Sequence, residues 1–163
     1  MIPLPGAPTG YTAHFITAGP LGIFLANGYD GSVLRIDPAT NTVKNLADVG
    51  SSAGPVVELN GALWVGSGHS VLYEINADTG AIKRRIDLGL HMQGLFEGSD
   101  GRSLWMRTDG PRVVRVDPQT GRPTSVALPA GVRDAIVLAA DPATGAVWAA
   151  SAPRAPGLMR LAP

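Results

Sequence analysis

The stretch that decides the fold runs from Gly61 to Asp100 and reads GALWVGSG, HSVLYEIN, ADTG, AIKRRIDLGL, HMQGLFEGSD. Short runs of alternating apolar and polar residues, separated by turn-forming residues, predict four short strands joined by tight turns. Pieces of this stretch recur on both sides at a spacing of about forty residues, and such a period indicates a repeat architecture. We therefore expect the rest of the chain to repeat this unit.

One turn sequence occurs three times along the chain. Its copies are RIDPATN from Arg35, EINADTG from Glu74 and RVDPQTG from Arg115. In each copy an Asp or Asn is placed to accept hydrogen bonds from the following backbone amides, and Gly or Asn stands where φ must become positive. Asp37, Asp117 and, in a related turn, Asp141 are therefore expected to serve the turns rather than chemistry.

An aromatic residue stands upstream of each turn, and a fourth copy supplies one more. The residues are Phe24, Trp64, Trp105 and Trp148, and we expect them to pack sheet against sheet. Each repeat thus contains an apolar first strand, an aromatic-bearing second strand, a third strand before the turn and a polar fourth strand. This gradient predicts that the first strand is the most buried and that the fourth faces water. No segment shows a sustained 3.6-residue apolar period, so we expect no helix.

Small sheets of this kind bury both faces by stacking radially, which is the β-propeller architecture. A single long sandwich would not predict the recurrence. We therefore predict an all-β fold, a β-propeller with four four-stranded antiparallel blades in one domain. The expected blades cover approximately residues 11–50, 51–89, 90–131 and 132–163.

The two ends of the chain suggest how the repeat array closes. The last repeat stops after its third strand, while residues 1–6 resemble the fourth strand at Ser125–Pro129. We predict that residues 1–6 complete the last blade. Three arrangements stay open: a four-bladed ring from one chain, half of an eight-bladed ring completed by a second chain, or a fragment of a longer propeller. We favour the homodimer.

Composition excludes several classes of function. The chain has 163 residues, 45% hydrophobic and 16% charged, which is a globular composition. The formal net charge is zero, with 13 basic and 13 acidic residues, so neither nucleic acid nor an anionic membrane is expected as a partner. The absence of cysteine excludes disulfides and thiolate chemistry. Without an apolar run of signal or membrane length, we expect a soluble protein, cytoplasmic or exported with its signal removed.

Candidate site residues lie in two sets of connections, which propellers place around the mouth of the central channel. The connections from a fourth strand to the next first strand contain His14, Ser52, His91, Arg133 and Asp134. Such a set can bind a carboxylate or a sugar, or hold a divalent ion through His and Asp, unless its members are ordinary solvated loop residues. His91, with apolar neighbours, is the best candidate for a catalytic base, and His14 is the second.

The connections from second to third strands add a possible basic rim. Arg107 and Arg112 lie in the third repeat, and Arg154 lies in the fourth. Together they suit an acidic peptide or a phosphate, or else they pair with Asp109 and Asp134. No phosphate-binding loop, serine elbow or metalloprotease motif accompanies them.

The repeat pattern resembles a known group of proteins. Gly-x-Leu-Trp-Val, followed by Val-Leu-x-Ile-Asn-x-x-Thr-Gly, is similar to the repeats of the streptogramin lyase (virginiamycin B lyase)-like propellers and their NHL and YVTN relatives. This resemblance implies a propeller whose ligands meet the channel mouth. It also implies, for the lyase, a magnesium-dependent elimination that uses a Glu-x-His and another His. The sequence contains no Glu-x-His or His-x-Glu.

Three functions stay open at this stage. The first is a non-enzymatic repeat module, without a cofactor, that binds a ligand or partner protein at the channel face. The second is a metal-dependent lyase or hydrolase related to the streptogramin lyases, with a divalent metal such as magnesium. The third is a self-assembling half-propeller with a structural role.

Overall fold

The computed structural model describes residues 14–50, 52–68, 70–89, 96–108, 110–133, 135–141, 143–151 and 157–161. These residues form β-strands, turns and loops, and none of them is helical, as the sequence predicts. Within this part of the chain there is accordingly no helix of the length and hydrophobicity that a membrane span requires. The chain divides into two compact units, Met1–Asp87 (unit 1) and Leu88–Pro163 (unit 2).

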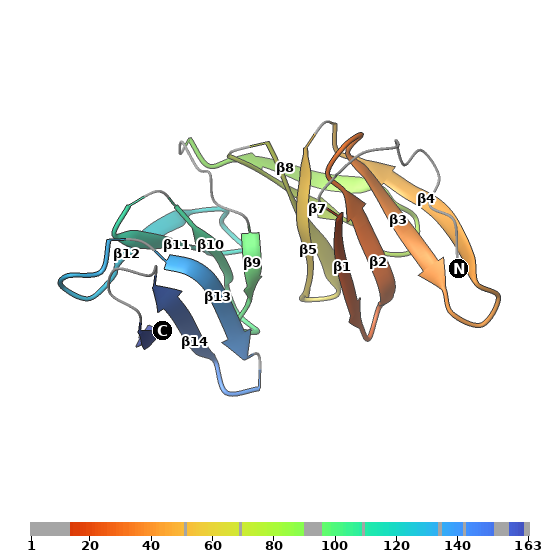
Figure 1. Cartoon of the computed structure of the whole chain (residues 1–163). Coiled ribbons are helices and arrows are strands. Elements are labelled where there is room, and N and C mark those ends of the chain that lie inside the picture. Colours follow the sequence, from red (N-terminus) through yellow and green to blue (C-terminus); the bar gives the residue numbers. More distant parts are fainter. Residues whose placement is uncertain are drawn as a thin grey trace. The chain divides into compact units, whose positions relative to one another are not determined.

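Unit 1 contains two four-stranded sheets, which Figure 1 shows in red to green. The first sheet consists of β1 (His14–Gly19), β2 (Gly22–Asn27), β3 (Ser32–Asp37) and β4 (Thr42–Asp48). The second sheet consists of β5 (Ala53–Leu59), β6 (Ala62–Ser67), β7 (Val71–Ile75) and β8 (Ile82–Asp87).

Unit 2 contains the third and fourth sheets. The third consists of β9 (Phe96–Ser99), β10 (Leu104–Arg107), β11 (Arg112–Val116) and β12 (Pro123–Ala127). The fourth has three described strands, β13 (Ala135–Asp141), β14 (Ala146–Ser151) and β15 (Leu158–Leu161). The predicted fourth strand of this sheet, residues 1–6, lies outside the described residues.

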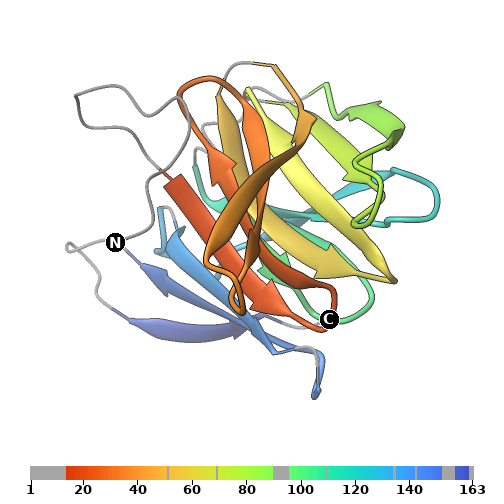
Figure 2. The same cartoon turned by 90° about the vertical axis from the view of Figure 1, so that its right-hand side faces the viewer.

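Every sheet is an up-and-down antiparallel meander, in which strands adjacent in the chain are hydrogen-bonded neighbours. Figure 1 shows the strands of the first sheet side by side in that order, and Figure 2 shows the same sheets turned by 90°. We call the end at which the first strand of a sheet begins its loop end. The opposite end, which carries the recurrent Asp or Asn turns, is its turn end. At the loop end the chain also passes from one sheet to the next.

The core of unit 1 lies between its two sheets. Phe24 and Val33 of the first sheet pack with Val56, Leu63 and Ile75 of the second. β5 lies beside β1 and β2 (Figure 1). Unit 1 thus buries the inner faces of two consecutive sheets against each other, as the predicted stacking requires.

The core of unit 2 repeats this arrangement. Trp105 and Val113 of the third sheet pack with Leu138, Val147 and Ala149 of the fourth. β13 lies beside β9 and β10. Phe24 and Trp105 therefore both pack toward the following sheet, as expected from their common position in the repeat.

The distribution of burial corrects one expectation. The fourth strands β4, β8 and β12 are largely exposed, as predicted. The first strands β1 and β5, however, are less buried than the second strand β6, because Ile16 of β1 is 66% exposed and β5 is only partly buried, while every residue of β6 is buried. A second strand has hydrogen-bonded neighbours on both sides, whereas a first strand lies at the edge of its sheet.

Candidate functional site

The loop end of unit 1 is held together by hydrogen bonds between its three connections. Val49 N donates to Gly31 O at 3.0 Å, which joins the β4–β5 connection to the β2–β3 turn. Gly68 N donates to Ser52 O at 3.1 Å, which joins the β6–β7 turn to the same connection. The buried Ser67 hydroxyl also donates to Val49 O at 3.0 Å. These bonds fix one continuous backbone surface across the two sheets.

A close backbone contact fixes the same surface further. Gly31 has φ +81°, and a Cβ there would lie 1.3 Å from Gly50 O. Only glycine allows this approach, because other residues carry a Cβ and disfavour positive φ. The β2–β3 turn and the β4–β5 connection are therefore closely packed.

The charged side chains at the loop end of unit 1 are acidic, and its own loops engage them. Asp30 accepts hydrogen bonds from Ser32 N at 2.9 Å and from the Ser32 hydroxyl at 2.7 Å. Asp48 accepts from Gly50 N at 2.8 Å. Residues 27–32, 48–50, 52–53, 67–68, 70–71 and 87–89 include no lysine or arginine.

The described residues at the loop end of unit 2 carry the opposite charge. Arg107 ends β10, Arg112 begins β11, and Arg133 lies in the connection from β12 to β13. Arg112 and Arg133 are exposed, and Arg107 is partly buried. The described residues at this end, 107–108, 110–112, 127–133, 135, 151 and 157–158, include no carboxylate. Three arginines thus gather at one end of unit 2.

Two hydrogen bonds fix the loops around Arg112 and Arg133. The Thr108 hydroxyl donates to Arg112 O at 2.9 Å, which closes the loop between β10 and β11. Leu128 N donates to Pro111 O at 2.9 Å, which ties that loop to the connection carrying Arg133. These two bonds connect the loop that carries Arg112 to the connection that carries Arg133.

The predicted site residues are distributed over the two units. His14 begins β1 at the loop end of unit 1, and its side chain lies outside the described part of the structure. Ser52 lies at the same end with φ 64°. His91 and Asp134 fall outside the described residues, so the grouping of all candidates around one axis stays a prediction. No group of three His, Cys, Asp or Glu suited to a metal ion occurs among the side chains that the structure describes.

The turn carboxylates have the structural role that the sequence predicts. The Thr40 hydroxyl and the Ala39 amide donate to Asp37 and lower its pKa. Hydrogen bonds from the Gln119 amide and the Thr144 hydroxyl likewise lower the pKa values of Asp117 and Asp141, respectively. These exposed carboxylates are therefore engaged in turns at the end opposite the loop end.

One structural carboxylate was not predicted from the sequence. Asp100 is buried and accepts hydrogen bonds from Trp105 Nε1 at 2.8 Å, Ser103 N at 2.6 Å and Arg102 N at 2.9 Å. Burial raises the pKa of Asp100, but these hydrogen bonds outweigh it and the net shift is downward. The signal in the sequence was the Asp-Gly turn five residues before Trp105, which resembles any other hairpin turn.

Comparison of the sequence with protein-family models and with curated proteins finds no match.

Solved structures do share its fold. The Myxococcus xanthus glutaminyl cyclase aligns with TM-score 0.64 and 14% identity over 94% of this chain and 74% of that one. The Kuenenia stuttgartiensis hydrazine synthase aligns with TM-score 0.70 and 14% identity over 90% of this chain and 44% of that one. BamB from Moraxella catarrhalis aligns with TM-score 0.65 and 16% identity over 83% of this chain and 39% of that one.

These alignments settle the architecture. This chain spans less than half the length of the hydrazine synthase and BamB chains. Identities of this size carry the fold and not the activity. The glutaminyl cyclase and BamB are β-propeller proteins, and this chain has the β-propeller fold that its repeats predict.

Proposed function

We propose that this chain is a non-enzymatic β-propeller repeat module that binds an acidic segment of a partner protein at the loop end of unit 2. The observation that carries the proposal is the exposure of Arg112 and Arg133 at that end. An acidic segment offers carboxylates that both guanidinium groups can bind.

Arginine suits this role because its planar guanidinium presents five donors and binds carboxylates through two parallel hydrogen bonds. Arg112 and Arg133 are exposed, so binding them does not require the fold to open. The Thr108–Arg112 and Leu128–Pro111 hydrogen bonds hold their backbones in place, which reduces the entropy lost on binding.

The proposal also includes the kind of β-propeller blade that the repeats form. The Gly61–Val65 pattern and the Thr-Gly turns support blades of the streptogramin lyase, NHL and YVTN kind. Lyase chemistry itself would need His14, His91 and a carboxylate such as Asp134 to converge, and it stays a prediction of the sequence. The loop end of unit 1, with its carboxylates bound to its own loops, is assigned a structural role here.

A binding assay with a matched control tests the proposal. The probe is a fluorescein-labelled, amidated hexaglutamate peptide, and the readout is fluorescence anisotropy at two salt concentrations. Arg112→Ala with Arg133→Ala should weaken binding about tenfold, because charge-assisted hydrogen bonds are lost. Arg102→Ala with Arg122→Ala removes two exposed arginines from the turn end of the same unit and should leave binding nearly unchanged.

The control pair separates a site from a general effect of charge. Both double variants lower the net charge equally, so a non-specific attraction would weaken equally in both. Equal losses, or no binding by the unaltered protein at low salt, would overturn the proposal.

A second function, self-association, has an observation of its own. In the fourth sheet Trp148 is 40% exposed and Leu158 is 71% exposed, although Trp148 holds the repeat position at which Trp105 is fully buried. Exposed apolar residues at a packing position indicate a face that another sheet covers. We infer that a second copy of this chain covers it, which is the shared-ring arrangement of the sequence analysis.

Sedimentation equilibrium at micromolar concentration tests this second function. We expect a mass of twice the 16.8 kDa chain. Trp148→Asp should shift the protein toward the monomer, while Ile82→Asp, at an exposed apolar position in unit 1, should not. A monomeric unaltered protein would exclude the function.

A further inference from the structure

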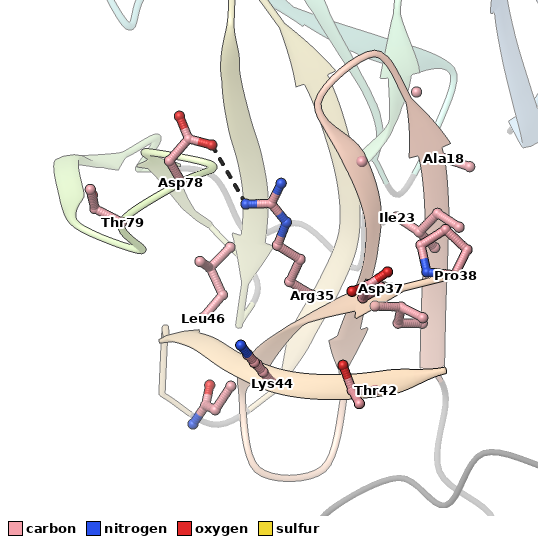
Figure 3. Close-up of a pocket in the computed structure, with 14 residues that line it drawn as sticks. Ala18, Ile23, Arg35, Asp37, Pro38, Thr42, Lys44, Leu46, Asp78 and Thr79 are labelled. Atoms are coloured by element: carbon pink, nitrogen blue, oxygen red, sulfur yellow. Dashed lines mark hydrogen bonds and ion pairs between the residues drawn. The ribbon is translucent and has the colours of Figure 1, made fainter. Parts of the chain in front are cut away.

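A cavity of about 700 Å³ opens at the turn end of unit 1, opposite its loop end. It lies between the first sheet and the β7–β8 turn of the second, with β3 and β4 on one side and Asp78 and Thr79 on the other (Figure 3). Its volume falls within the range of about 300–1,000 Å³ typical of small-molecule sites. No sequence motif pointed to this place.

The shape of the cavity is set by backbone packing. Gly80, with φ +72°, lies so close to β4 that a Cβ would be 1.7 Å from Leu46 O. The turn is held internally as well, because Gly80 N donates to Asn76 O at 2.9 Å. The β7–β8 turn is therefore fixed against β4, and the space between them is preformed.

Two cations line the cavity side by side. Arg35 of β3 and Lys44 of β4 are direct cross-strand partners, so their side chains lie on the same face of the sheet. Like charges directly opposite one another destabilise a strand pair. A bound anion would relieve this repulsion.

The anions of the protein neutralise these cations only in part. Arg35 Nη1 lies 3.5 Å from Asp78 Oδ1 and 3.3 Å from Ala77 O, and Asp78 is 85% exposed at its side chain. Asp37 accepts hydrogen bonds from its own turn through both carboxylate oxygens. The Lys44 ammonium makes no hydrogen bond or ion pair with any described residue, and its charge acts on Asp37 at longer range, where it helps to lower the pKa of that carboxyl.

Arg35 is also held in position. Its guanidinium carbon lies 5.8 Å from the centroid of the Phe24 ring, and its side chain extends from β3 toward Asp78 (Figure 3). The guanidinium therefore stands at a fixed place on the cavity wall. Ala18, Ile23, Pro38 and Leu46 add apolar lining beside the two cations.

We propose that this cavity binds a small organic carboxylate with an apolar body. The carboxylate accepts hydrogen bonds from the Lys44 ammonium and the Arg35 guanidinium, and the apolar part lies against Ile23 and Leu46. This combination matches ligand sites in general, which pair an apolar lining with a few polar groups that fix orientation. The site lies within unit 1 and uses none of the arginines of unit 2.

The probe for the test is N-acetyl-leucine, with N-acetyl-leucinamide as the uncharged control. Both are titrated into the full chain labelled with ¹⁵N, and backbone amide shifts are followed by NMR. We expect the acid to shift the amides of Gly22, Thr42 and Thr79, which surround the cavity. The amide control should bind about tenfold more weakly, because it lacks the charge-assisted hydrogen bonds.

Two variants should change the affinity for the acid in opposite directions, and a third serves as their control. Lys44→Ala should weaken binding of the acid about tenfold. Lys83→Ala, an exposed lysine on β8 outside the lining, is the matched control and should not. Asp78→Asn removes the carboxylate that competes for Arg35 and should strengthen binding about threefold.

The outcomes are decisive in either direction. Shifts confined to the cavity, with the predicted order of the three variants, support the site. Equal binding of acid and amide, equal effects of Lys44→Ala and Lys83→Ala, or shifts spread over the surface would overturn it. Because Lys44 and Asp78 are exposed, these variants keep the fold, and the amide spectra report directly whether they do.

Discussion

Trp64 and Trp148 occupy the same repeat position in the second and fourth sheets, yet their surroundings differ. Trp64 is the cross-strand partner of Glu74, which is in turn the partner of Arg84 on the fourth strand β8. Arg84 bonds to Glu74 and lies over the Trp64 ring at 5.2 Å from its centroid. Trp64 is 2% exposed, whereas Trp148, whose sheet has three described strands, is 40% exposed.

The comparison shows what a polar fourth strand contributes to this fold. β8 is mostly exposed and adds little to the apolar core. Its Arg84 nevertheless covers an aromatic ring with an aliphatic stem and a guanidinium plane. In the second sheet the fourth strand thus shields the packing residue of its own sheet.

The largest effect should come from truncating the two tryptophans. Trp64→Ala should lower the free energy of unfolding by about 3–5 kcal/mol, because a large buried side chain is lost. Trp148→Ala should lower it by less than about 1 kcal/mol, because the ring is already partly solvated. Urea denaturation of both variants, at concentrations where the chain is monomeric, measures the difference. Similar losses in the two variants would show that both rings contribute equally despite their different burial.

The next effect concerns the close contact between the β7–β8 turn and β4. Gly80→Ala places a Cβ against Leu46 O and should cost about 3 kcal/mol of unfolding free energy. Gly145→Ala, in unit 2, has a similar φ of 71° but open space around it, and should cost about 1 kcal/mol. Thermal or urea midpoints compare the pair. A Gly80→Ala protein as stable as Gly145→Ala would show that the turn relaxes away from β4.

Asp100 distinguishes the indole of Trp105 from that of Trp64. Trp105 Nε1 donates to Asp100, whereas Trp64 Nε1 is buried without a hydrogen-bond partner in the described structure. Asp100→Asn should cost about 2 kcal/mol near neutral pH, since a charged acceptor is lost. The measurement is the urea midpoint of each protein.

The pH dependence of the Asp100 effect has a definite sign. The pKa of Asp100 is lowered in the folded protein from its ordinary value of 3.8. Its ionised form therefore stabilises the fold above that value, and the contribution is lost as pH falls through the lowered folded-state pKa. The stability gap between the unaltered protein and Asp100→Asn should narrow on acidification. A constant gap would contradict the assignment.

The smallest effect tests the cover that Arg84 forms over the Trp64 ring. Glu74→Gln should cost about 1 kcal/mol or less and should increase acrylamide quenching of Trp64, because Arg84 is no longer held over the ring. Asp78→Asn breaks a more exposed ion pair and should change neither quantity measurably. Fluorescence in a Trp105→Phe, Trp148→Phe background reports on Trp64 alone. Unchanged quenching in Glu74→Gln would show that Arg84 stays in place without its carboxylate.

Much of the fold could be predicted because the same pattern of residues recurs in each repeat. Four aromatic positions and three copies of one turn each give the same register, so an error in one copy is corrected by the others. The repeat predicts the fourth blade within residues 132–163, and the structure places three strands there, Ala135–Asp141, Ala146–Ser151 and Leu158–Leu161. Local pattern and global fold agree at these positions.

The features that the sequence did not predict depend on contacts between repeats. The burial of the second strands follows from neighbours on both sides, which a hydrophobicity gradient along one repeat does not record. The cavity beside Arg35 and Lys44 follows from the approach of Gly80 to Leu46, two residues in different sheets. A repeat pattern describes what the copies share, whereas a binding site depends on where they differ.

The meander topology also governs how such a chain changes in size. Every hydrogen-bonded strand pair in the described sheets joins neighbours along the chain, and no strand is inserted between earlier ones. Duplication or loss of one repeat of about forty residues therefore leaves the pairing inside the remaining sheets intact. Chain length in this architecture is free to evolve in whole-sheet steps, while the loops at either end diversify independently.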